Sequence, residues 1–98
     1  MIDACLACLA ACENCATECI RMANSLHLRC IALCRDCADI CALCTKFELR
    51  SSQFKEEIMK LCADVCRACA AECDKFDDEH CRACARACMK CAEECSTY

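Results

Sequence analysis

The spacing of the cysteines constrains the fold of this chain more than any other feature of its sequence. The chain contains nineteen cysteines in four groups, and within each group they lie alternately three and four residues apart. The groups are Cys5, Cys8, Cys12, Cys15 and Cys19; Cys30, Cys34, Cys37, Cys41 and Cys44; Cys62, Cys66, Cys69 and Cys73; and Cys81, Cys84, Cys88, Cys91 and Cys95. This alternation places every cysteine of a group on one face of an α-helix, whereas a β-strand would need a spacing of two. The pattern therefore predicts four helices, each with one cysteine-lined face.

The composition favours a helical domain over a small secreted fold held by disulfides. The 98 residues include neither glycine nor proline, on which the turns of such secreted folds depend. A chain of this length predicts one domain, spanning residues 1–98.

Charge and hydropathy argue against two classes of partner. The formal net charge is −4, acidic and basic residues are interspersed, and few residues are aromatic, so no nucleic-acid surface is expected. No apolar run is long enough to cross a membrane, and the first residues do not form a signal peptide. We therefore expect a cytoplasmic protein, in which thiols stay reduced.

The first two breaks in the cysteine pattern predict helix ends. Asn24 is a residue that tolerates the left-handed conformation, and Ser25 is suited to cap the second helix. The second break, over residues 45–52, is longer, and the second helix is expected to extend into it. We expect the third helix to begin at Ser51 or Ser52.

The third break, over residues 75–78, is short, with Asp77 or Asp78 expected to cap the fourth helix. Helices joined by short connections pack antiparallel to one another. The sequence thus predicts an all-α fold, an antiparallel up-down-up-down four-helix bundle with a cysteine-lined core.

Such a core would be a tube of sulfur, and ordinary cores use larger aliphatic side chains for their volume. Cysteine can act as a small hydrophobic residue, but its use at nearly every core position indicates a function for the sulfur. Structural disulfides are an alternative that a reducing compartment disfavours, and the odd number of cysteines would leave one unpaired. Zinc and iron–sulfur sites prefer discrete sets of four ligands, usually presented by loops.

Cu(I) fits a continuous row of thiols best. Soft thiolates select Cu(I), which accepts two or three sulfurs, and one thiolate can bridge two ions. If each ion binds two sulfurs and each sulfur serves two ions, the core takes about one ion per cysteine, or about nineteen. The charges of these ions would balance those of the thiolates and remove the penalty for burying them. All nineteen cysteines are therefore candidate ligands for multiple Cu(I) ions.

Three further residues, Met22, His27 and His80, each lie within three residues of a cysteine. Alternating helix directions bring them to one end of the predicted bundle. A thioether and two imidazoles there would offer a site where copper enters or leaves. Met59 is expected at the opposite end as part of the core, and Met89 outside the core.

The chain resembles the bacterial copper storage proteins, specifically their cytosolic class. The resemblance covers essentially the whole chain and rests on "CADICALC" (37–44), "LCADVCRACAAEC" (61–73) and "HCRACARACMKCAEEC" (80–95). It implies a four-helix bundle whose thiols hold many Cu(I) ions, with histidines at its open end. It also implies homotetramers, storage without turnover, and exchange of copper with a donor or acceptor protein.

Two other functions remain to be weighed against copper storage. One is a zinc or general soft-metal buffer with a role like that of metallothionein, although metallothioneins lack helical periodicity. The other is a thiol oxidoreductase, which would need one exposed cysteine pair with a depressed pKa. The pairs in this chain are equivalent and predicted to be buried, so we expect a protein that is not an enzyme.

Overall fold

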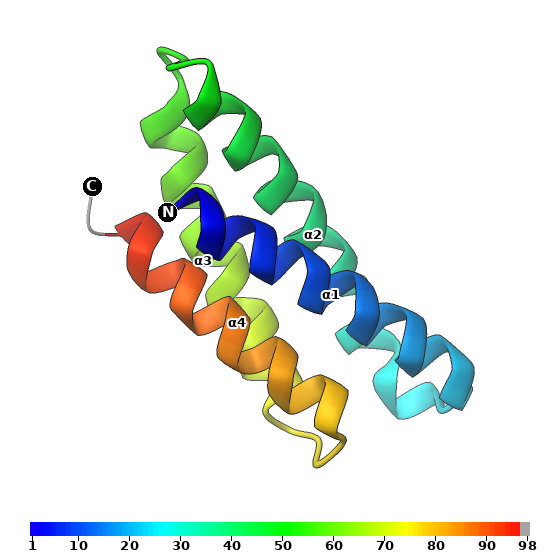
Figure 1. The fold of residues 1–98 in the computed structure, drawn as a ribbon. Coiled ribbons are helices and arrows are strands. Elements are labelled where there is room, and N and C mark those ends of the chain that lie inside the picture. The colour runs from blue at the N-terminus through cyan, green and yellow to red at the C-terminus, as the bar shows by residue number, and fades with distance from the viewer. Residues whose placement is uncertain (97–98) are drawn as a thin grey trace.

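The structure, a computed structural model, describes residues 1–96, and over these residues the chain forms four α-helices and one short 3-10 helix (Figure 1). The helices are α1 (Ile2–Met22), α2 (Leu28–Leu49), α3 (Lys55–Cys73) and α4 (Glu79–Ser96), with the 3-10 helix η1 (Ser25–His27) before α2. The described residues contain no β-strand, which confirms the predicted all-α class.

The four helices form an elongated bundle in which each helix runs antiparallel to the next (Figure 1). α1 packs against α2 and α4, and α3 packs against the same two helices, so the four surround a common axis. The bundle measures 41 × 18 × 18 Å. These contacts confirm the up-down-up-down arrangement. We call the end that carries Met22, His27 and His80 the His end, and the opposite end, which carries Met59, the Met59 end.

In the connection between α1 and α2, the left-handed residue lies one position earlier than predicted. Ala23, rather than Asn24, adopts the left-handed conformation, with φ 53°, and its N–H donates to the carbonyl of Ile20 at 3.1 Å. Asn24 is extended instead, and its side-chain oxygen accepts the N–H of Leu26 at 3.0 Å. The asparagine side chain therefore caps η1, and the prediction of Ser25 as the cap is wrong.

The second connection starts α3 later than predicted. α2 extends to Leu49, as expected, and Ser51 has a left-handed φ of 51°. The Ser52 hydroxyl accepts the N–H of Phe54 at 3.1 Å, and its carbonyl accepts the N–H of Lys55 at 3.1 Å. These bonds form a turn before the helix, so the prediction that α3 begins at Ser51 or Ser52 is wrong.

Asp78 occupies the position directly before α4. Its carbonyl accepts the N–H groups of Cys81 and Arg82, each at 3.0 Å. Of the two candidate aspartates, Asp78 is therefore the one whose backbone begins the helix. Its side chain turns to His27 instead of capping the helix, with 3.5 Å between the carboxylate oxygen and Nε2.

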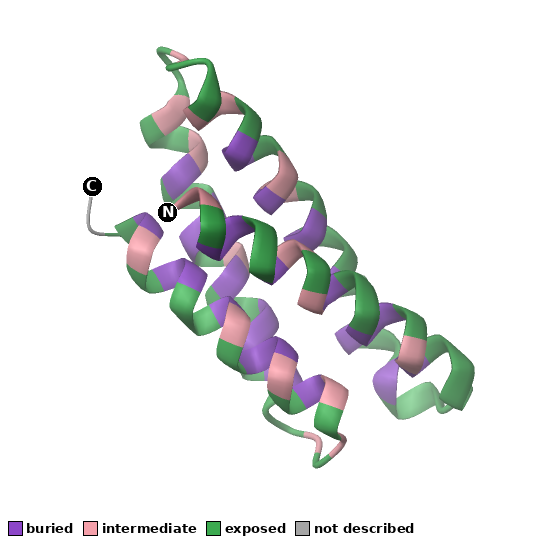
Figure 2. Ribbon diagram, viewed as in Figure 1, coloured by how far each residue is buried: buried purple, intermediate pink, exposed green. Residues whose placement is uncertain are grey.

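The buried faces of the four helices all point toward the bundle axis (Figure 2). Every cysteine is buried, with at most 2% of its surface exposed. The buried positions beside the cysteines are mostly alanine: Ala4, Ala16, Ala38, Ala63, Ala70, Ala85 and Ala92. Small side chains let the helix backbones approach closely, so the interior consists mainly of thiols and methyl groups. The predicted cysteine-lined core is confirmed. None of the helices in the described part of the chain has the length and apolar character needed to span a membrane.

Candidate metal centre

The thiols of the core lie in contact along most of the bundle. Neighbouring Sγ atoms are 3.5–4.0 Å apart, both within a helix, as for Cys8 and Cys12 at 3.9 Å, and between helices, as for Cys37 and Cys66 at 3.5 Å. Within a helix these contacts join residues four apart, because such residues lie one above the other on the same face. The alternating sequence pattern thus becomes a continuous three-dimensional array of sulfur.

An unbroken series of these contacts leads from the Met59 end to the His end, and no step is longer than 4.0 Å. The series runs through Cys95, Cys91, Cys41, Cys66, Cys8, Cys88, Cys12, Cys84, Cys34, Cys30, Cys15 and Cys19. All four helices contribute to it. An ion inside the bundle can therefore pass from one set of sulfur ligands to the next without leaving thiol surroundings.

The sulfur spacing fits metal ions that bind thiolates. With a metal–thiolate bond of about 2.3 Å, as for zinc, one ion can link sulfurs up to about 4.6 Å apart. In the described residues, at least five sets of four cysteines have all their Sγ atoms within 4.8 Å of one another. Five of these sets are Cys5, Cys62, Cys91 and Cys95; Cys8, Cys12, Cys37 and Cys88; Cys8, Cys41, Cys66 and Cys91; Cys12, Cys69, Cys84 and Cys88; and Cys15, Cys34, Cys73 and Cys84.

These sets share members, and this sharing bears on which metal they suit. Cys8, Cys12 and Cys88 each belong to two of the five sets, as do Cys84 and Cys91. Separate tetrahedral zinc sites need four ligands of their own. Ions that accept two or three sulfurs and share them can use every set at once, which is the behaviour of Cu(I). All nineteen cysteines are free thiols, so the described chain contains no disulfide.

The protonation of the thiols depends on burial and on their neighbours. Burial raises the pKa of Cys19, as does the adjacent charge of Cys30, and burial also raises the pKa of Cys81. Nearer the middle, hydrogen bonds from Cys12, and then Cys41 and Cys66, lower the pKa of Cys37 to about 7. Cys19 and Cys81 therefore hold their protons more tightly than a free thiol does, and binding of a metal to them must release these protons.

The three residues predicted at the His end have different surroundings. His80 is half-buried, and its Nε2 lies 3.4 Å from the Sγ of Cys19, which in turn lies 3.8 Å from the Sγ of Cys81. His27 is buried, but its ring stacks on Phe76 with 4.0 Å between ring centroids. His80 thus directly extends the row of thiols.

Met22 does not continue the buried face, because α1 ends at this residue and 42% of its surface is exposed. At the other end Met59 is only 1% exposed, which confirms that it belongs to the core. Met89 is 43% exposed, which confirms its place outside the core.

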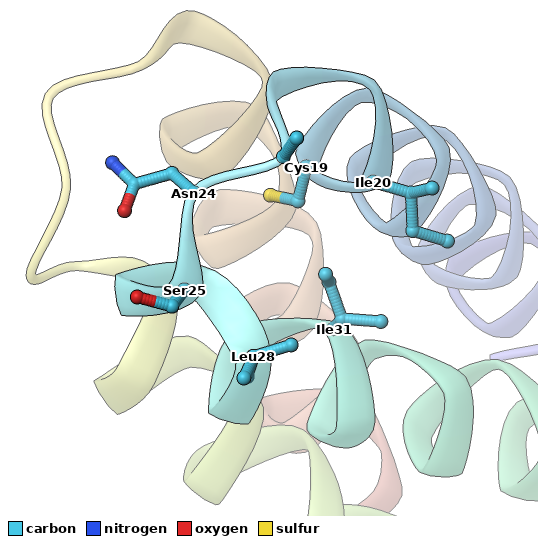
Figure 3. A pocket seen from close by; sticks show the side chains of 7 residues that line it. Cys19, Ile20, Asn24, Ser25, Leu28 and Ile31 are labelled. Atoms are coloured by element: carbon cyan, nitrogen blue, oxygen red, sulfur yellow. The ribbon is translucent and has the colours of Figure 1, made fainter.

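A cavity of about 320 Å³ opens between α1 and α2 at the His end (Figure 3). Cys19 lines it together with the apolar side chains of Ile20, Leu28 and Ile31. Ile20 and Leu28 are exposed, whereas Cys19 is buried. The cavity brings the outermost thiol of α1 close to the protein surface.

The sequence did not predict a group of contacts at the His end that join the start of α2 to the end of α3 and to the connection after it. Glu72 is buried, and its carboxylate accepts Lys75 Nζ at 2.9 Å and Arg29 Nε at 3.3 Å. Phe76 covers His27, and Asp78 lies against the same ring. Phe76 is an apolar residue within a charged connection, and this was the one available sign that the connection folds back onto the bundle.

A four-helix bundle with a continuous, shared array of buried thiols and an imidazole at one end defines a multinuclear thiolate metal-binding protein. Comparison with known proteins places the chain more closely. It belongs to the copper storage protein family, whose model matches residues 1–98.

Proteins from Bacillus subtilis show the relationship in sequence and in structure. The cysteine-rich protein YhjQ of strain 168, itself uncharacterized, is 52% identical over 77 residues, covering 78% of this chain and 71% of YhjQ. The Cu(I)-bound copper storage protein BsCsp3 matches with a TM-score of 0.94 and 50% identity, over 98% of this chain and 92% of that chain. Metal-free Csp3 from Bacillus subtilis matches with a TM-score of 0.91 and 49% identity over the same shares.

A more distant structure is the Nmul_A1745 protein of Nitrosospira multiformis. It is 31% identical, with a TM-score of 0.53, over 96% of this chain and 99% of that chain. The four-helix fold is therefore shared with the Cu(I)-bound and the metal-free Csp3 structures.

Proposed function

We propose that this protein stores Cu(I) as many ions bound by the thiolates that line its core. The observation that carries the proposal is the unbroken series of sulfur contacts from Cys95 to Cys19, in which neighbouring sets of four thiols share members. Membership of the copper storage protein family and similarity to Cu(I)-bound BsCsp3 support it. All nineteen cysteines are the proposed ligands, with a capacity of about one ion per cysteine.

Charge balance supports Cu(I) over divalent ions. Each thiol that binds Cu(I) loses one proton and gains one positive charge, so a filled core at one ion per thiolate carries little net charge. A divalent ion at the same ratio would leave a large uncompensated positive charge in a buried space. Zinc can balance its charge only by using several thiolates for each ion, which returns the core to discrete sites.

We propose that copper enters and leaves at the His end. His80 lies against Cys19 there, and the cavity between α1 and α2 reaches the same thiol. The Met59 end has a buried thioether among its cysteines, and a cavity of about 270 Å³ there reaches Cys95, but no histidine lines that cavity. A direct role for Met22 stays a prediction, since its side chain lies at the surface.

The proposal also includes the compartment, the oligomeric state and the exchange partner of the protein. A store of reduced thiolates suits the cytoplasm, where thiols are not oxidised, and binding without turnover needs no catalytic group. Exposed apolar residues on the outer faces, among them Leu6, Leu43 and Leu61, are compatible with the proposed homotetramer. Copper would pass to and from this assembly through a donor or acceptor protein.

A titration tests the proposal against the alternative of a zinc or general soft-metal buffer. Reduced, metal-free protein is titrated with Cu(I) under anaerobic conditions in the presence of a chromogenic Cu(I) chelator, and in parallel with Zn(II). We expect free Cu(I) to appear only near one ion per cysteine, and zinc to be displaced by copper. A break near one ion per four cysteines, with zinc bound as tightly as copper, would replace storage of Cu(I) with discrete tetrathiolate sites.

A further inference from the structure

The two histidines of the His end contact different parts of the structure. His80 touches the thiol array through Cys19, whereas His27 touches the connection between α3 and α4. Only 3% of the surface of His27 is exposed, and neither ring nitrogen forms a hydrogen bond within the described chain. Its ring is stacked on Phe76 at an interplanar angle of 23°, and its Nε2 lies 3.5 Å from a carboxylate oxygen of Asp78.

These contacts join the start of α2 to the segment that begins α4. Arg29, two residues after His27, donates to the buried carboxylate of Glu72 at 3.3 Å, near the end of α3. Glu72 also accepts Lys75 at 2.9 Å. The start of α2 is thus attached both to the last turn of α3 and to the connection that follows it.

The same connection determines where His80 lies. The carbonyl of Asp78 accepts the N–H groups of Cys81 and Arg82, so the position of Asp78 fixes the first turn of α4. His80 is in this first turn, and its Nε2 is 3.4 Å from the Sγ of Cys19. A shift of Asp78 away from His27 would therefore move His80 relative to the thiol.

We propose that His27 is a positioning residue for copper entry: by stacking on Phe76 and packing against Asp78, it holds the α3–α4 connection so that His80 stays against Cys19. This rests on the proposed function, in which Cu(I) enters at the His end. His80 is the imidazole that meets the incoming ion, and His27 acts through it. A small displacement of a first ligand is sufficient to slow metal transfer, because residues that orient ligands typically change metal affinity or activity by about 10- to 100-fold.

The decisive experiment compares rates of copper uptake at equal final capacity. Cu(I) is supplied as its acetonitrile complex to the reduced, metal-free protein, and formation of copper–thiolate bonds is followed by stopped-flow ultraviolet absorbance. We expect His80→Gln to slow the first phase of uptake about tenfold while the capacity per cysteine is unchanged. His27→Ala, which removes the stack, should slow it by a similar factor.

A matched variant separates positioning from ligation. His27→Phe keeps an aromatic ring against Phe76 but has no atom that binds copper, so it should restore an uptake rate within about twofold of the parent. Uptake in His27→Phe that is as slow as in His80→Gln would make His27 a ligand and overturn the proposal. The double variant His27→Ala/His80→Gln should be no slower than His80→Gln alone, because both changes act on one group. If the double variant took up copper more slowly than His80→Gln, by the product of the two single effects, the proposal would also be overturned.

Two further measurements keep the test valid if His27→Ala does not fold. Phe76→Ala leaves both histidines in place and should slow uptake about tenfold, whereas Phe76→Tyr keeps the stack and should not. In the metal-free protein, the ring ¹⁵N signals of His80 should move in Phe76→Ala and stay in Phe76→Tyr. Unchanged uptake in Phe76→Ala would overturn the proposal. Failure of the parent protein itself to take up Cu(I) would instead overturn the storage function, so the two outcomes are distinguishable.

Discussion

The two ends of the bundle are built from different groups, although the thiol array between them is uniform. The Met59 end contains a buried thioether among the cysteines, and Cys5, Cys62, Cys91 and Cys95 form a set of four thiols there. The His end contains imidazoles, a buried carboxylate and a connection that folds against them. A uniform interior gives an ion no preferred direction, so the difference between the ends decides where it enters.

The largest expected effect concerns the array itself. Filling the core with Cu(I) should stabilise the protein by more than about 4 kcal/mol, the gain from one site at a ligand concentration 1,000 times its Kd, because many ions bind the folded state. The free energy of unfolding of metal-free and loaded protein, measured in guanidinium chloride under anaerobic conditions, checks this. Equal stability of the two forms would mean that copper does not bind the folded array.

The next effect tests the Met59 end. Met59→Ala leaves a cavity in the core and should lower the free energy of unfolding by about 3 kcal/mol, whereas Met59→Leu should lower it by less than about 1.5 kcal/mol. Urea unfolding of the metal-free variants measures both values.

The same pair tests whether this end is closed. If Met59 blocks it, Met59→Ala should partly restore the uptake rate that His80→Gln removes, and Met59→Leu should not. No difference between the two variants in the His80→Gln background would mean that the Met59 end is not closed by this side chain.

A smaller effect is expected from the ion pairs of the His end. Glu72→Gln removes the charge that binds Arg29 and Lys75, and should destabilise the metal-free protein by about 1.5 kcal/mol, since both partners remain solvated. Glu13→Gln is the matched control, because Glu13 is exposed on the outer face of α1 and should change the stability by less than about 0.5 kcal/mol. If both substitutions changed the free energy of unfolding equally, the ion pairs of the buried Glu72 carboxylate would not stabilise the His end.

The smallest expected effect is the pH dependence of the metal-free protein. Burial raises the pKa of Cys19 and Cys81, so the folded state keeps these protons at a pH where the unfolded chain has lost them. Their contribution to stability is therefore complete below about pH 8.5 and is lost as the pH rises through the folded-state values. The urea midpoint should fall above that pH, and Cys19→Ser/Cys81→Ser should reduce the fall. A midpoint that rises instead would contradict the direction of these shifts.

The interior could be predicted from the sequence almost completely, and the ends could not. The three–four spacing fixes which face of each helix is buried, because helical geometry leaves no other arrangement for it. Helix ends depend on single turn hydrogen bonds, so Ala23 took the left-handed position expected of Asn24, and Ser52 formed a turn before α3.

The surroundings of His27 and Met22, at the His end, could not be predicted from the spacing of the cysteines. His27 looked equivalent to His80 in the sequence, but Phe76, from another connection, covers it. Met22 matched the spacing of the cysteines, yet α1 ends at that residue and leaves it at the surface. Local periodicity contains no information on either contact.

The most direct test of the central claim is X-ray absorption spectroscopy of the copper-loaded protein at the copper K edge. The account predicts Cu(I) bound by two or three sulfurs, together with scattering from neighbouring copper ions, because thiolates shared along the array bring ions close together. Four sulfur neighbours for each ion, with no copper–copper scattering, would contradict it, since that result requires separate sites and not a continuous store.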